Sequence, residues 1–190
     1  PRRTTNSNHR YHKYRNLIKG LVPDAPNVLW VSDITYIDTL DGCCYLHLVT
    51  DAYSRKIVGW CLSETPHATH TVRALKMAID ATGKGTLEGL IHHSDRGVQY
   101  CCDEYITLLK EHHIRISMTE DSNPTDNGMA ERVNGIIKNE ILEPLQTPKN
   151  LLEAMPIVDH AIRTYNTLRP HLSLSMRTPA QVYEGKQIIL

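Results

Sequence analysis

The sequence lacks several features that would point to particular classes of protein. Phenylalanine is absent from all 190 residues, so Leu, Ile, Val, Tyr and Trp must supply the core of a chain that is 41% hydrophobic. No apolar run approaches the ~20 residues that a membrane-spanning helix needs, and no signal peptide opens the chain. We therefore expect one globular core, a cytoplasmic location and no membrane partner.

Cysteine is also sparse and arranged in a way that argues against a disulfide framework. The five cysteines include two adjacent pairs, and no C-x-x-C motif occurs. Reduced thiols are the simplest interpretation. The eleven histidines leave a zinc-dependent DNA-binding module as one alternative. Adjacent pairs such as His92-His93 and Cys101-Cys102 do not match the spacing of zinc ligands, which disfavours that alternative.

Acidic residues are missing from the first twenty positions, although the whole chain has no net charge. Residues 1–20 contain six Lys and Arg residues and no acid, so residues 21–190 carry a net charge of −6. This contrast predicts a basic arm or linker over 1–20 ahead of a mildly acidic body. Such an arm favours an anionic partner, although a solvated tail would have the same composition.

The hydrophobic pattern predicts an α/β protein. Strands are expected at 27–38, 43–51, 56–63, 89–95 and 114–118, and helices at 69–82, 103–112, from 129 onward and at 148–166. The order βββαβαβαα indicates a mixed five-stranded sheet that is flanked by helices. Asp41-Gly42 is a good turn for the first hairpin.

Three carboxylates stand out against this pattern. Asp33 falls inside the first strand, where both faces look covered, and a carboxylate there is costly unless it is paired or binds a metal. Asp95 ends the fourth strand, at a sheet edge where ligands often bind. Glu131 follows a polar turn-rich loop and lies in the first turn of a helix, 36 positions after Asp95. Taken singly, each has a structural explanation, as a paired Asp, a turn residue and a helix N-terminal acid.

Four motifs carry a resemblance to a known family. The segments WVSDITYI, HSDRGVQY, DNGMAERVNGIIKNE and YNTLRPHLSLSMRTPAQVY, spread from about Val28 to Tyr183, closely resemble the catalytic core of bacterial insertion-sequence transposases of the OrfB type. These transposases are related to retroviral integrases. The resemblance implies a ribonuclease-H-like fold over 21–190 and a DDE triad at Asp33, Asp95 and Glu131.

The resemblance also implies a chemistry and partners. It implies metal-dependent DNA strand cleavage and strand transfer, with Mg²⁺ or Mn²⁺ held by the triad and two ions expected when DNA is bound. The partners would be double-stranded DNA, as transposon ends and target, and further copies of the chain on that DNA. Family members usually carry a helix-turn-helix region ahead of the core, so end recognition is not expected from the basic arm alone. Candidate DNA contacts are Asn127, Arg132, Lys138, Arg163, Arg169 and His171.

Two alternatives share this metal chemistry or this partner. A ribonuclease-H-like nuclease would hydrolyse strands without joining them, and a non-catalytic fragment would bind DNA or oligomerise only. The Y-N-x-x-R-P-H segment, from Tyr165 to His171, leaves a further choice open. Arg169 and His171 could contact DNA, or they could hold the C-terminal tail against the core.

Overall fold

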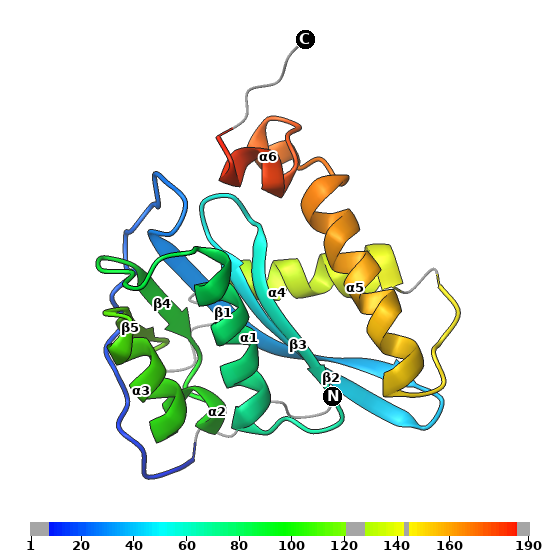
Figure 1. Ribbon diagram of the computed structural model, residues 1–190, viewed down its shortest axis with the longest axis horizontal. Helices are drawn as coiled ribbons and strands as arrows, with labels where there is room; N and C mark the ends of the chain where they lie inside the picture. Colours follow the sequence, from blue (N-terminus) through cyan, green and yellow to red (C-terminus); the bar gives the residue numbers. More distant parts are fainter. Residues whose placement is uncertain (1–7, 121–127, 143–144, 186–190) are drawn as a thin grey trace.

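The computed structural model describes residues 8–120, 128–142 and 145–185 of the chain (Figure 1). Five strands form one mixed sheet in the order β3-β2-β1-β4-β5. Their bounds are β1 Leu29–Thr39, β2 Gly42–Asp51, β3 Ile57–Ser63, β4 Ile91–Ser94 and β5 Arg115–Met118. The predicted five-stranded mixed sheet is confirmed. β1 is its central strand.

Strand pairing follows from the connections. β1, β2 and β3 pair antiparallel as a meander, because short turns join them, and Gly42 supplies the left-handed φ of +142° at the first turn. β4 pairs parallel with β1, and β5 pairs parallel with β4, since each follows a crossover that contains a helix. The pairing changes at β1, which is antiparallel to its neighbour β2 and parallel to its neighbour β4.

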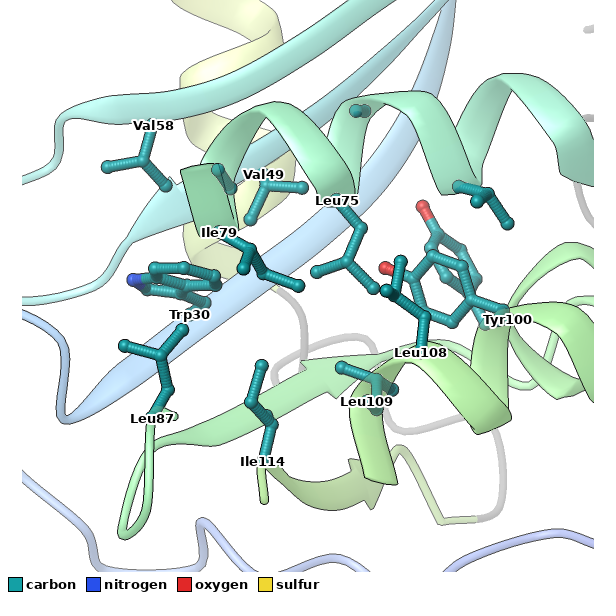
Figure 2. Packing of buried hydrophobic residues seen from close by; sticks show 14 of the residues in the cluster. Trp30, Val49, Val58, Leu75, Ile79, Leu87, Tyr100, Leu108, Leu109 and Ile114 are labelled. Carbon is teal, nitrogen blue, oxygen red and sulfur yellow. The ribbon is translucent and has the colours of Figure 1, made fainter. Parts of the chain in front are cut away.

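One face of the sheet packs against α1, Ala68–Ala81, and α3, Asp103–Glu111, which the short α2, Val98–Cys101, precedes. Figure 2 shows Ile79 of α1 next to Trp30 of β1, which is fully buried, and Leu75 of α1 on the side toward Leu108 of α3. Close packing explains why Gly59 of β3 has no side chain. An added Cβ there would overlap the backbone oxygen of Ala74.

The opposite face packs against α4, Gly128–Gly135, and α5, Leu151–Thr167 (Figure 1). α4 continues into the π-helix η1, Ile136–Leu142, and α5 runs through Pro156 as one helix. The short η2, Leu172–Leu174, and α6, Pro179–Tyr183, complete the chain. The Asn150 side chain caps α5 by accepting from the backbone N–H groups of Leu152 and Glu153. No helix among the described residues has the length and hydrophobicity that a bilayer crossing requires.

The part of the basic arm that the structure describes lies along the outer edge of β5. The Met118 N–H donates to the Arg15 carbonyl at 3.3 Å, and the Leu17 N–H donates to the Ser117 hydroxyl at 2.8 Å. Lys19 forms an ion pair with Glu120 at 2.6 Å. This segment therefore covers the edge of the sheet that β5 would otherwise present to solvent.

Candidate active site

Asp33 and Asp95 lie at matching positions of two neighbouring strands. β1 and β4 pair in parallel register, with Val31 opposite His93. Two residues further along each chain are Asp33 and Asp95, the latter directly after β4. Residues in matched parallel register point to the same face of a sheet about 4.8 Å apart. The two carboxylates therefore share the face that α4 covers.

α4 brings Glu131 to this face through a contact that the sequence pattern did not identify. The amide nitrogen of Asn134 donates to Asp33 Oδ2 at 2.7 Å. Asn134 lies one turn after Glu131, so both side chains belong to the same flank of α4. The buried Ala130 packs with Leu29 and holds the start of the helix on the sheet. A polar residue three positions after Glu131 was the available signal for Asn134.

The electrostatics of Asp33 show that the charges of Asp95 and Glu131 both act on this buried carboxylate. The pKa of Asp33 is raised from 3.8 to about 7. Burial is the largest cause of this rise, and the negative charges of Asp95 and Glu131 contribute to it. The hydrogen bonds from the Ile34 backbone and from Asn134 oppose the shift only in part. The site thus gathers carboxylates whose negative charges raise the pKa of Asp33.

This donor set fits a hard divalent cation in its chemistry. Carboxylate oxygens are the ligands that Mg²⁺ and Mn²⁺ prefer, and mutual repulsion among carboxylates is relieved by a cation between them. Within residues 8–120, 128–142 and 145–185, however, no three acidic, His or Cys side chains are arranged closely enough to hold a metal ion. Glu131 is exposed on the first turn of α4. The carboxylates are therefore near enough to affect the pKa of Asp33 but do not form a complete set of metal ligands.

The candidate DNA contacts fall into distinct environments. Asn127, with Asp126, lies outside the described residues. Arg132 is exposed in α4 next to Glu131. Lys138 lies on the same flank as Glu131, with its ammonium 3.9 Å from the centre of the Tyr36 ring. Arg132 and Lys138 therefore lie in the same continuous helical segment, α4 and η1, as Glu131.

The remaining candidates have partners within the protein. Arg163 pairs with Asp159 one turn earlier in α5. Arg169 donates to Glu140 through Nε at 2.8 Å and through Nη2 at 2.5 Å. The His171 ring is buried edge-on against Tyr165, with ring centres 5.0 Å apart. Arg169 and His171 thus attach the C-terminal segment to η1 and α5.

Tyr165 and Asn166 of the same motif have clear structural roles. The Tyr165 hydroxyl donates to the Arg55 carbonyl at 3.0 Å. The Asn166 side chain accepts from the Ile57 N–H and donates to the Ile57 carbonyl, each at 2.9 Å. At Ile57, on the outer edge of β3, the Asn166 amide therefore makes the two hydrogen bonds that a neighbouring strand would make.

Comparison with known proteins agrees with this geometry. A family model described as "Integrase core domain" matches residues 23–124, and a second model with the same description matches 112–179. The chain belongs to the integrase core family. Within the family it groups with insertion-sequence transposases. An insertion element IS600 protein of Shigella sonnei is 37% identical over 185 residues, covering 96% of this chain and 67% of that protein.

Two further relatives extend the comparison. The transposase for insertion sequence element IS904 of Lactococcus lactis is 35% identical over 82% of this chain and 60% of its own length. The catalytic core domain of HTLV-2 integrase, solved in complex with magnesium as a dimer, superposes with a TM-score of 0.67 at 26% identity, covering 84% of this chain and 98% of that one. This integrase core therefore has the ribonuclease-H-like fold that its motifs predicted. The chain spans 67% of the length of the IS600 protein and 60% of the length of the IS904 transposase.

Proposed function

We propose that this integrase core catalyses metal-dependent cleavage of DNA strands and their transfer to new DNA, with Asp33, Asp95 and Glu131 as the catalytic carboxylates. The observation that supports the proposal is that β1, the end of β4 and α4 bring these three residues to one face of the sheet, where the charges of Asp95 and Glu131 both raise the pKa of Asp33. A structural role for each would not require the three to share one field.

Each residue has a distinct task. Asp33 and Asp95 hold the cations from the sheet, and Glu131 completes the site from α4. Two bound Mg²⁺ or Mn²⁺ ions would lower the pKa of a water or 3′-hydroxyl nucleophile and offset charge on the departing 3′ oxygen. Asn134 keeps Asp33 in one orientation through its 2.7 Å hydrogen bond, which reduces the reorganisation that binding requires.

The DNA partner follows from charge and from the relatives. We propose residues 1–20 as a basic arm and Arg132, Lys138 and Asn127 as phosphate or positioning contacts around the core at 21–190. DNA binding should therefore weaken steeply with salt. The HTLV-2 core is described in a dimeric and a trimeric form, and we propose that this chain also self-associates on transposon ends and target DNA. A cytoplasmic, DNA-associated location goes with this function.

Glu131→Gln tests the assignment because it keeps the shape of the side chain and removes its charge. With Mg²⁺ and duplex DNA that carries the element's ends, we expect cleavage and joining to fall on the order of 100-fold or more, since metal-ion catalysis contributes several kcal/mol. Glu111→Gln, at an exposed position of α3, is the matched control. Equal rates for Glu131→Gln and the parent chain would end the proposal. Products that are cut but never joined would identify a nuclease instead.

A further inference from the structure

A cavity of about 450 Å³ lies on the other flank of α4 from Asn134. It is bounded by the β2–β3 turn, the first two turns of α4 and the segment after α5. Its walls include Arg55, Arg132 and His171, and no Asp or Glu lines it. Neither the three catalytic carboxylates nor Asn134 belongs to its wall, so the cavity is separate from the acidic site, with Arg132 next to both.

Arg55 is held toward this cavity by the fold. The buried Asp51 carboxylate accepts from the backbone N–H and the hydroxyl of Ser54, at 2.8 and 2.6 Å, which shapes the turn. Arg55 then takes a left-handed φ of +67°, a conformation that non-glycine residues rarely adopt. The Tyr165 hydroxyl clamps its carbonyl from the other side. A left-handed backbone conformation at a non-glycine residue costs free energy, and such residues are often found at functional sites.

The Arg55 guanidinium retains free donors. Its recorded contacts, to the Ala52 carbonyl and to Met129 Sδ at 2.9 Å, both use Nη1. Guanidinium carries five N–H donors in a planar fork, and Nε and Nη2 have no hydrogen-bond partner in the described part of the chain. These donors are suited to the bidentate binding of an anion.

The charged side chains that line the cavity are both arginines, Arg55 and Arg132. Burial lowers the pKa of Arg55, and the nearby positive charge of Arg132 lowers it further, against opposing contributions from Tyr165 and Asp51. Burial also lowers the pKa of His171, with Arg169 and Arg55 adding to the effect against an opposing contribution from Glu140. Two guanidinium groups close together without a lining carboxylate repel each other, and a bound anion would offset that cost in free energy.

The remaining walls are apolar. Met129, Val133 and Ile136 lie along one flank of α4, and the Tyr165 ring lies beyond them. A volume of about 450 Å³ is within the range of roughly 300 to 1,000 Å³ for small-molecule sites. Cationic donors next to an apolar wall match a phosphate joined to a sugar better than they match a free inorganic ion.

The outer ridge of α4 leaves room for a strand to reach both sites. Gly128 and Gly135 are seven residues apart, and an added Cβ at either would meet no atom within 4 Å. Arg132 projects between them and follows Glu131 directly in the sequence. A DNA strand at Glu131 would therefore meet Arg132 next as it crossed the helix.

We propose that this cavity binds a phosphate group of a DNA strand, with Arg55 and Arg132 donating to its oxygens and the adjoining sugar against Met129 and Ile136. The inference rests on the proposed function, because it takes DNA as the substrate. It adds a second, non-catalytic phosphate site that fixes where the strand leaves the carboxylates.

The test uses a catalytically inactive background, Asp33→Asn, with a metal chelator present, so that binding is measured apart from chemistry. A duplex oligonucleotide with 5′-hydroxyl ends is titrated into the isotope-labelled chain while the ring signals of His171 and the Nε–H signal of Arg55 are followed by NMR. Inorganic phosphate is titrated in parallel. We expect DNA to shift both signals, and phosphate to shift them only at much higher concentration.

Arg132→Gln should weaken DNA binding roughly 10-fold at low salt, as loss of a charge-assisted hydrogen bond does, and lower the salt slope by about one. Arg55→Lys keeps the charge but loses the planar fork, and should weaken binding without changing the salt slope. Arg73→Gln, on α1 at the opposite face, serves as the matched control and should leave affinity unchanged.

The outcomes separate the two ideas. If DNA binds while the His171 and Arg55 signals stay fixed, the cavity proposal is wrong, and joining by the unmutated chain still decides the function. If the signals shift but the unmutated chain with Mg²⁺ neither cuts nor joins DNA, the cavity stands and the catalytic proposal fails. Phosphate binding as tight as DNA binding would mean that the cavity takes a free anion, and would also overturn the inference.

Discussion

Asp33→Asn should stabilise the metal-free protein, and the gain should grow with pH. Asp33 is half-buried beside two other carboxylates, and its pKa is raised from 3.8 to about 7. A group whose pKa is higher in the folded than in the unfolded state binds protons more tightly when folded. Its ionisation therefore costs stability as pH rises through this window.

The size of the effect follows from the shift. Each pKa unit corresponds to about 1.4 kcal/mol, so a rise from 3.8 to about 7 amounts to about 4 kcal/mol at pH values above 7. At about pH 4 most of this cost is absent, since the folded protein keeps Asp33 protonated. An Asn side chain is neutral at every pH and can still accept the hydrogen bond from Asn134.

The assay is urea unfolding of the parent chain and Asp33→Asn, from about pH 4 to about pH 8 with a chelator present. The difference in unfolding free energy should widen by about 4 kcal/mol in favour of Asp33→Asn. Asp38→Asn, at an exposed position of the same strand, controls for charge removal from β1 and should give no such widening. Added Mg²⁺ should stabilise only the parent chain. A difference that stays constant with pH would refute the argument that the three carboxylates share one field.

Three further outcomes can be measured. Asn134→Ala should reduce strand joining and move the pH profile of the reaction to higher pH, because Asp33 loses a bond that lowers its pKa; an unmoved profile would leave Asn134 a packing role only. His47 and His92 are buried with pKa values lowered from 6.5 to about 3, chiefly by burial. Burial of the neutral rings costs nothing extra above pH 6.5, but the unfolded chain gains protons as pH falls from 6.5 toward 3. The free energy of unfolding of the Asp33→Asn protein should therefore fall by about 3 kcal/mol between about pH 6.5 and pH 5. A urea midpoint that does not change over this range would contradict the prediction. Gly59→Ala should cost about 2 kcal/mol or more, since its Cβ would also lie 2.8 Å from that of Ala78, whereas Gly135→Ala should be neutral or stabilising by thermal unfolding.

Local patterns were sufficient for much of the fold. Residues 27–38 predicted a strand around Asp33 with both faces covered, and the structure confirms that β1 is central and packed on both faces. The order of strands and helices also held, because hydrophobic period and turn residues act over a few positions. The four motifs, which include Asp33, Asp95 and Glu131, indicated the family, and the comparisons confirm it.

Contacts between distant segments could not be predicted in this way. The bond from Asn134 to Asp33 joins residues 101 positions apart, and no local period encodes it. The cavity at Arg55 depends on the turn shaped by Asp51 meeting α4, which only the folded chain brings together. Composition likewise described a basic arm, but the pairing of Arg15 with Met118 of β5 depends on the path of the chain in space.

The two borders of the sheet limit how copies of this chain can meet. Residues 15–17 occupy the border at β5, and Asn166 fills the hydrogen-bonding position at Ile57 on the border at β3. Joining of two sheets into a continuous one needs unoccupied backbone donors and acceptors on both partners. The proposed assembly on DNA should therefore avoid strand pairing at residues 115–118 and at Ile57, and contacts through helix side chains or through the nucleic acid would leave the strands that carry the acidic residues undisturbed.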